Sequence, residues 1–107
     1  MDYVKLGKTG LEISRICLGT NMFGAGYVDD VRAMSVIDQA YDEGVNFIDT
    51  ADAYHSGLSE QLVGKAIKGR RQDFVIATKG FMATGLGINE SGLSRKHLMG
   101  AVESSLQ

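Results

Sequence analysis

The chain has 107 residues, of which 44% are hydrophobic and 22% charged, a balance typical of one soluble domain and not of a disordered or fibrous protein. The formal net charge is -2, and the one short basic cluster, Lys68, Arg70 and Arg71, is too small for a nucleic-acid surface. The single cysteine, Cys17, cannot form an internal disulfide and no apolar run approaches the length of a membrane span, so we expect a cytoplasmic protein without nucleic-acid or membrane partners.

The N-terminal segment is predicted to form a hairpin and one strand. Two strand-like runs, residues 3–6 and 11–14, flank a turn bounded by Gly7 and Gly10, and this pattern predicts a β-hairpin. The apolar run of residues 16–18 then predicts a buried strand. Cys17 lies on this strand, so we interpret it as a small packed hydrophobe and not as a reactive thiol.

The first helix is predicted over about residues 31–43, where apolar side chains recur at helical spacing. Asp29 or Asp30 can cap its start, and Gly44 can end it. The apolar run of residues 45–48 is the next predicted strand.

A second helix is predicted to open at Ser59 and Glu60, to carry one apolar stripe, and to end at Gly69. Residues 74–78 form the third predicted strand, again a buried one. After a glycine-rich loop, Ser94 can cap a third helix, and the sequence is expected to stop inside that helix. The apolar residues of this helix are Leu98, Ala101, Val102 and Leu106.

Apolar strands that alternate with amphipathic helices predict the α/β class, with a parallel sheet covered by helices. No linker or repeat divides the sequence, so residues 1–107 are expected to be one segment of a single domain. Right-handed crossovers leave two architectures open, a (β/α)8 barrel and an open doubly wound sheet. The barrel requires the second strand to lie between the first and the third.

Three polar residues gather at the carboxyl edge of the predicted sheet. Asp49 follows the second strand, Tyr54 lies in the loop after it, and Lys79 ends the third strand. Both architectures place their active sites at this edge. Neighbouring strands lie roughly 4.8 Å apart, which puts Asp49 and Lys79 within reach of an ion pair.

The three residue types suit proton donation to a carbonyl. A tyrosine is a poor acid at neutral pH, and a cation beside its hydroxyl favours the phenolate that remains after the proton leaves. Lys79 can be that cation, and Asp49 can hold and orient it. Taken singly, a loop tyrosine usually packs and a charge at a strand end is usually solvated, so the grouping carries the interpretation. The result is the tuned proton donor that carbonyl reduction requires.

The sequence around these residues resembles that of the aldo-keto reductase family. Residues 47–54, Phe-Ile-Asp-Thr-Ala-Asp-Ala-Tyr, followed by Ser59 and Glu60, resemble the family signature, and residues 76–79 resemble its lysine motif. The segment of residues 6–20 is similar to the family's opening hairpin and first barrel strand, so the resemblance runs from end to end of the chain.

One further motif points to a branch of that family. Residues 92–98 resemble the branch that contains the potassium-channel β subunits and many bacterial reductases. That branch holds enzymes and cofactor-binding regulatory subunits alike. A regulatory subunit of a larger complex is therefore the alternative to a reductase.

The resemblance implies the N-terminal part of a (β/α)8 TIM barrel, preceded by a β-hairpin, with about three βα units present. It implies an NAD(P)H-dependent oxidoreductase that reduces aldehydes or ketones to alcohols, with NADP(H) or NAD(H) as cofactor and no metal. Tyr54 would protonate the carbonyl oxygen, while Lys79 and Asp49 tune it. Thr20, Asn21 and Asp49 are implied to lie near the nicotinamide end of the cofactor.

Other candidate residues fit less well. The family's fourth catalytic position, usually a histidine after the fourth strand, is expected to lie beyond residue 107. Neither histidine present fits it, because His97 falls within the third helix and His55 follows Tyr54 directly. His55 either lines the substrate mouth or, more commonly for such a position, is an exposed loop residue without a special role. The glycine-rich residues 84–90 lack the third glycine of a dinucleotide fingerprint, and no helix opens directly from them.

A complete barrel needs roughly 250 residues and eight strands, so this sequence cannot form one. An open three-stranded piece leaves two edges unpaired and its apolar faces half covered, which predicts aggregation. We therefore expect the chain to be part of a longer polypeptide or of a larger molecule, and to be inactive alone. Its expected partners are the remainder of the barrel and a small carbonyl substrate, with oligomer formation left open.

Overall fold

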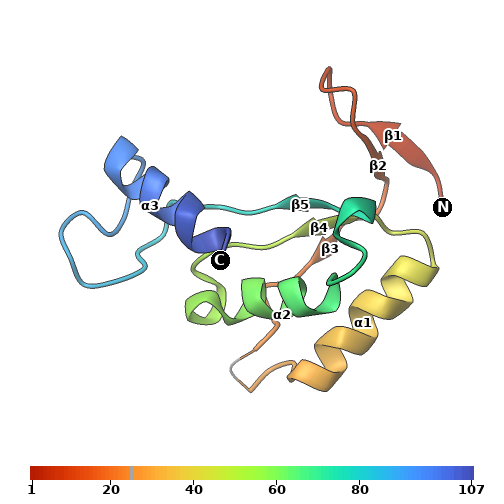
Figure 1. Cartoon of the computed structure of the whole chain (residues 1–107), viewed down its shortest axis with the longest axis horizontal. Helices are drawn as coiled ribbons and strands as arrows, with labels where there is room; N and C mark the ends of the chain where they lie inside the picture. The colour runs from red at the N-terminus through yellow and green to blue at the C-terminus, as the bar shows by residue number, and fades with distance from the viewer. Residues whose placement is uncertain (25) are drawn as a thin grey trace.

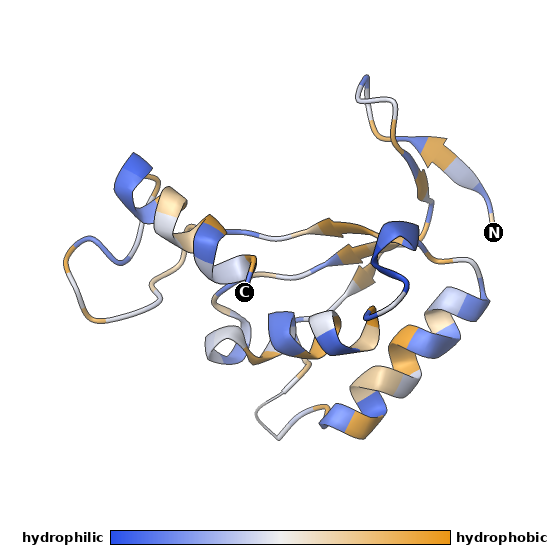
Figure 2. Cartoon of the chain, in the orientation of Figure 1, coloured by the Kyte–Doolittle hydropathy of each residue, from blue (hydrophilic) through white to orange (hydrophobic). Residues whose placement is uncertain are grey.

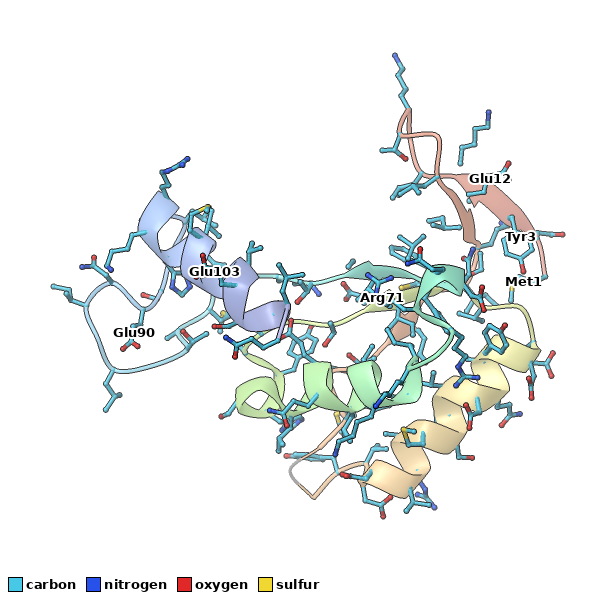
Figure 3. All side chains as sticks on the ribbon, viewed as in Figure 1. Met1, Tyr3, Glu12, Arg71, Glu90 and Glu103 are labelled. Carbon is cyan, nitrogen blue, oxygen red and sulfur yellow. The ribbon has the colours of Figure 1, made fainter. Side chains whose placement is uncertain are left out.

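The structure is a computed structural model that describes residues 1–24 and 26–107. An N-terminal hairpin lies at one end of a small parallel sheet, and two helices lie against one face of that sheet (Figure 1). The hairpin pairs β1 (Tyr3–Lys5) with β2 (Glu12–Ser14) in antiparallel fashion, which confirms the predicted hairpin. The Tyr3 hydroxyl donates to the carbonyl of Gly44 at 2.7 Å and ties the hairpin to the end of the first helix (Figure 3).

The parallel sheet carries the edge where the polar residues were predicted to meet. Its strands are β3 (Leu18–Gly19), β4 (Phe47–Asp49) and β5 (Val75–Ala77). Their order is β3-β4-β5, so the second strand of this sheet separates the first from the third, as a barrel requires. Gly19 and Ala77 both lie opposite Asp49 in the register, which aligns the carboxyl ends of the strands.

Helix α1 (Asp30–Asp42) is capped by Asp29, whose carboxylate accepts from the backbone N–H of Arg32 at 2.8 Å. Of the two predicted caps, the first is therefore the one used. After the helix, Gly44 has a φ of 90°, and a Cβ at this position would lie 2.9 Å from the Met1 Cβ. Both the backbone conformation and the close approach of the N-terminus require glycine here.

Two further helices follow the strands. The 3-10 turn η1 (Tyr54–Gly57) leads directly into α2 (Leu58–Ala66), so α2 begins one residue before the predicted start and ends before Gly69. A short 3-10 turn, η2 (Arg71–Asp73), precedes β5. Helix α3 (Arg95–Ser105) lies beyond the carboxyl ends of the strands, and the Ser94 hydroxyl accepts from the N–H of His97 at 3.1 Å, as the predicted cap requires.

The core lies between α1, α2 and the face of the sheet that they cover. Most residues of the three parallel strands are hydrophobic (Figure 2). Ile48 on β4 and Ile37 on α1 are both fully buried. The buried cluster consists of Phe23, Ala33, Ile37, Ile48, Leu62, Val63, Ala66, Ile67 and Phe74. This cluster packs α2 against the helix-covered face of the sheet.

Two predictions for the segment before β3 are wrong. The first parallel strand begins at Leu18 and not at residue 16, and Cys17 is exposed where a packed side chain was expected. Leu18 packs against the helix-covered core, whereas Cys17, the residue before β3, is exposed. In α3 and at its C-cap, Val102 and Leu106 are exposed (56% and 81%), whereas Leu98 and Ala101 are half-buried.

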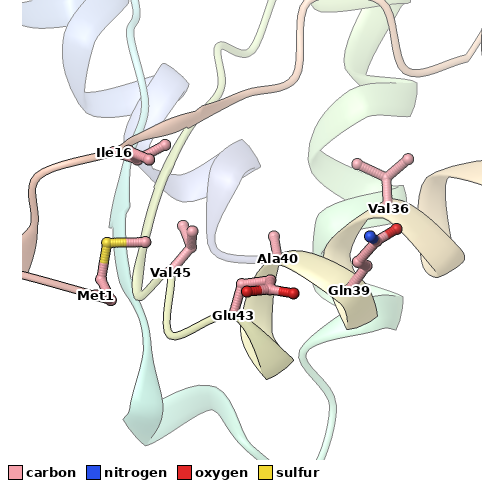
Figure 4. Close-up of a pocket in the computed structure, with 7 residues that line it drawn as sticks. All are labelled: Met1, Ile16, Val36, Gln39, Ala40, Glu43 and Val45. Atoms are coloured by element: carbon pink, nitrogen blue, oxygen red, sulfur yellow. The ribbon is translucent and has the colours of Figure 1, made fainter.

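A shallow apolar groove lies between the hairpin and α1, at the amino ends of the strands (Figure 4). Met1, Ile16 and Val45 form one wall, and Val36 and Ala40 of α1 contribute to the other. The groove is at the end of the sheet opposite to Asp49, so it does not belong to the candidate site. No helix in the described part of the chain is long and apolar enough to cross a membrane.

Candidate active site

Asp49 and Lys79 form the predicted ion pair. The Lys79 Nζ lies 2.7 Å from both carboxylate oxygens of Asp49 and also donates to the carbonyl oxygen of Thr50 at 2.9 Å. The lysine side chain is 49% exposed and the aspartate side chain 35% exposed. The pair therefore sits at an open edge of the sheet, where a ligand can reach it.

Tyr54 completes the group. Its hydroxyl lies 3.4 Å from the Lys79 Nζ, and the same ammonium is 5.2 Å from the centre of the tyrosine ring. Tyr54 is the first residue of η1, and its backbone N–H donates to the carbonyl of Ala51 at 3.2 Å. The structure thus brings together all three residues that the sequence analysis selected as catalytic.

The ammonium form of Lys79 is favoured by its neighbours. Partial burial by itself lowers the pKa of Lys79, but the hydrogen bonds and charges of Asp49 and Tyr54 outweigh it, and the net effect raises that pKa above its ordinary value. The pair therefore contributes stability that is fully present below the ordinary lysine pKa of about 10.4 and is lost as the pH rises through the raised value. At neutral pH the cation beside Tyr54 is retained.

The turn after Tyr54 has an unusual backbone. His55 and Ser56 both adopt left-handed conformations, with φ of 49° and 56°, although neither is glycine. Such residues cost about 1–3 kcal/mol each and persist where surrounding contacts hold them. His55 Nε2 donates to the carbonyl of Asn21 at 2.8 Å, and its ring lies 5.5 Å from that of Tyr27. His55 therefore joins two loops at the carboxyl edge, a contact that its loop position alone did not indicate.

The candidate cofactor residues lie at the same edge but differ in exposure. The Thr20 side chain is fully buried, and its hydroxyl and backbone N–H both donate to the carbonyl of Asp49 at 3.0 Å. Asn21, the next residue, is exposed. Among the residues that the structure describes, no three His, Cys, Asp or Glu side chains gather into a group that could hold a metal ion.

Comparison with known proteins assigns the family. The family model for the aldo/keto reductase family matches residues 15–107. The chain belongs to the aldo/keto reductase family. Members of this family are generally NAD(P)-dependent oxidoreductases. The resemblance noted in the motifs is thereby confirmed.

Relatives of this aldo/keto reductase chain include proteins named as potassium channel β subunits and, among solved structures, bacterial aldo-keto reductases. A protein of Arabidopsis thaliana named "Probable voltage-gated potassium channel subunit beta" is 40% identical over 110 residues, which cover 100% of this chain and 33% of the relative. A protein of the same name from Oryza sativa subsp. japonica is 36% identical, with the same coverage. The chain spans about a third of the length of these curated relatives.

Solved structures agree on the fold. The holo form of an aldo-keto reductase from Bacillus halodurans has a TM-score of 0.87 and 37% identity, over 99% of this chain and 35% of that chain. A thermostable aldo-keto reductase solved with the inhibitor epalrestat has a TM-score of 0.80 and 36% identity, over 99% of this chain and 38% of that chain. The three parallel strands and their helices are thus the N-terminal portion of a (β/α)8 barrel.

Asp52 is a buried carboxylate of this aldo/keto reductase chain that the sequence analysis did not select. It is 8% exposed, and its oxygens have no side-chain hydrogen-bond partner among the described residues. Burial raises the pKa of Asp52, and the negative charge of Glu60 raises it further, while the backbone of Ala53 and the charge of His97 act in the opposite direction. Folding therefore disfavours the ionised form.

This raised pKa predicts a pH-dependent gain from Asp52→Asn. In wild type, the stability that favours protonated Asp52 is fully present below about pH 3.9 and is lost as the pH rises through the raised folded value. The asparagine cannot ionise, so the free energy of unfolding of the variant should increase relative to wild type across that interval. The measurement is chemical denaturation at several pH values, in the complete barrel, meaning a protein in which this chain is joined to the other strands and helices of the fold.

Asp2→Asn is the control, because Asp2 is exposed and lies outside this edge. It should produce no comparable gain. If the stability of Asp52→Asn relative to wild type stayed constant from about pH 3 to pH 7, the burial cost assigned to Asp52 would be wrong.

Proposed function

We propose that the complete barrel containing this chain reduces aldehydes or ketones to alcohols with NAD(P)H, and that Tyr54 donates the proton. The observation that carries the proposal is the position of the Lys79 ammonium, which lies 2.7 Å from the Asp49 carboxylate and 3.4 Å from the Tyr54 hydroxyl. A preorganised cation beside the oxygen where charge develops is a large source of catalysis in such sites.

The residues present fit the nicotinamide end of the cofactor in one respect. Asn21 is exposed at the carboxyl edge, and an amide side chain can both donate to and accept from a carboxamide. The Thr20 hydroxyl is committed to the Asp49 carbonyl, so any contribution of this residue to binding would be through the position of the backbone. Bound NAD(P)H supplies the hydride that reduces the carbonyl carbon.

The residues of the chain supply the proton and stabilise the phenolate that remains. Tyr54 transfers its phenolic proton to the carbonyl oxygen as that oxygen gains negative charge, and the resulting phenolate is stabilised by the Lys79 ammonium. Asp49 holds the ammonium in place through two hydrogen bonds. A proton from solvent then restores Tyr54, so one hydride and one proton together convert the carbonyl to an alcohol.

The chain alone is expected to be inactive. The uncovered face of the sheet leaves the pair of Asp49 and Lys79 open to water, which weakens electrostatic stabilisation of the transition state. Closure of the barrel would supply the missing walls.

The test is oxidation of NADPH by the complete barrel with a panel of aldehydes and ketones, alongside a direct measurement of NADPH binding. We expect NADPH to be consumed in proportion to the alcohol formed. A protein that bound NADPH but reduced no member of a broad panel would count decisively against the proposal.

A second candidate is a cofactor-binding regulatory subunit, which the relatives named as potassium channel β subunits favour. In this case the same site would report the redox state of the cofactor to a membrane protein. The expected result is a partner whose affinity for the complete barrel differs between the reduced and oxidised cofactor. Equal affinity with both forms, or no membrane partner, would remove this candidate.

A further inference from the structure

Each strand of the parallel sheet is followed directly by a threonine. Thr20 comes after β3, Thr50 after β4 and Thr78 after β5. Because the strands are in parallel register, the three threonines form a row across the carboxyl edge, immediately beside Asp49 and Lys79.

Ser59, in the first turn of α2, bonds two members of this row. Its hydroxyl lies 2.8 Å from both the carbonyl oxygen and the Oγ1 of Thr20, and 3.1 Å from the Oγ1 of Thr50. All three residues are almost completely buried. The Thr20 hydroxyl donates to Asp49, so the Ser59 hydroxyl donates to Thr20 and accepts from Thr50, which satisfies every hydroxyl in the group.

Glu60, the next residue of α2, bonds the third member. The Thr78 hydroxyl donates to the Glu60 carboxylate at 2.6 Å. Hydrogen bonds to an ionised acceptor are shorter and stronger than those between neutral groups. Two adjacent side chains of one helical turn therefore hold the ends of all the strands in this sheet.

The same threonines are bonded to the catalytic pair. Thr20 donates through its N–H and its hydroxyl to the Asp49 carbonyl, at 3.0 Å each. The Thr50 carbonyl accepts from the Lys79 Nζ at 2.9 Å, and Thr78 directly precedes Lys79. A shift of Ser59 or Glu60 would be transmitted to both members of the ion pair through a single intervening residue.

We propose that Ser59 and Glu60 are positioning residues of the proton-donor site. They fix the positions of the strand ends next to Asp49 and Lys79 relative to each other. The expected effect on kcat rests on the proposed reductase function. The expected effect on the contact between Asp49 and Lys79 does not depend on turnover. Substitution of either residue should therefore reduce stabilisation of the transition state and leave substrate affinity almost unchanged.

The first test is Ser59→Ala in the complete barrel. A misplacement of reacting groups by about 1 Å can cost as much as 100-fold in rate, so we expect kcat to fall about ten- to 100-fold while KM for carbonyl and cofactor changes less than about twofold. Gln61→Ala is the matched control, because Gln61 is the next exposed residue of the same helix and should leave kcat unchanged.

Glu60 provides a test that does not depend on the fully buried serine. Glu60→Ala removes the acceptor for Thr78 and should lower kcat, whereas Glu60→Gln retains an amide oxygen at the same place and should restore most of the activity. Thr78→Val removes the other partner. The double variant Glu60→Ala with Thr78→Val should be no slower than the slower single variant, since both changes break one interaction.

The ion pair itself can be followed without turnover. In the complete barrel with 13C-labelled lysine ε-carbons, the NMR titration midpoint of Lys79 should fall in Ser59→Ala and in Glu60→Ala, because a looser contact with Asp49 supports the ammonium less. A purely stabilising role would leave this midpoint unchanged in the folded variant.

If wild type fails to reduce carbonyls but the midpoints shift, the reductase function fails and the positioning role stands. If wild type is active while kcat and the Lys79 midpoint are unchanged in both variants, the positioning role is overturned.

Discussion

Tyr54→Phe in the complete barrel is expected to lower kcat for carbonyl reduction by about 10²- to 10⁴-fold, the usual contribution of a general acid. The substitution removes only the hydroxyl that lies 3.4 Å from the Lys79 Nζ and leaves the ring in place. Affinity for NADPH should therefore stay within about twofold of wild type, because the proton donor acts in the transition state and not in cofactor binding. Steady-state kinetics and a fluorescence titration of NADPH give the two numbers.

Tyr41→Phe is the matched control for this substitution. Tyr41 is on α1, and its hydroxyl donates to Asp73 at 2.9 Å, away from the carboxyl edge. The same chemical change at this position should leave kcat unaltered. Turnover by Tyr54→Phe at the wild-type rate would show that another group supplies the proton.

Lys79→Met is expected to have the second largest effect, with a fall in kcat of about 10²- to 10³-fold, as for the loss of one preorganised electrostatic contact. Methionine is similar in length but cannot stabilise a phenolate, and it leaves the Asp49 carboxylate without its cation. Lys79→Arg retains a positive charge in a planar group of different shape, so it should recover only part of the loss. The measurement is kcat over a range of pH.

Lys65→Met provides the comparison for Lys79→Met. The Lys65 side chain is 65% exposed and forms a 3.6 Å surface ion pair with Asp30. Its replacement should change neither kcat nor the pH profile, because exposed ion pairs contribute little. Equal activity of Lys79→Met and Lys65→Met would exclude the ammonium from the chemistry.

The features that sequence reasoning predicted correctly depend on short-range rules. The Asp29 and Ser94 caps follow from a side chain that accepts a hydrogen bond from a backbone N–H three residues later. The pairing of Asp49 with Lys79 follows from their places at the ends of adjacent parallel strands. The cap inference is local, whereas the pairing also needs the two strands to be neighbours, which the alternation of strands and helices predicts.

The features that were missed depend on what lies across the sheet or around a turn. Cys17 was predicted to be packed, but burial on that face depends on elements beyond the neighbouring helices. The left-handed turn at His55 and Ser56 has no local signal, because neither residue is glycine and the contact that holds His55 comes from Asn21.

The sequence held a partial signal for the contacts of Ser59. A threonine follows each of the predicted strands or ends it, at Thr20, Thr50 and Thr78, and a serine with a glutamate opens the intervening helix. The repeated position of the threonines was a signal that hydroxyl groups meet at one edge. Which hydroxyl bonds which strand end required the packing of α2 beneath the sheet.

The order of the strands also has a consequence for how such a barrel is made. The contacts at the site join residues of neighbouring βα units, with sequence separations of 30 between Asp49 and Lys79 and 39 between Thr20 and Ser59. The entropic cost of closing a loop grows only slowly with its length, and domains generally fold as units during synthesis. Asp49, Tyr54 and Lys79 therefore leave the ribosome before any later strand of the barrel, but their cluster is enclosed only when the whole domain folds.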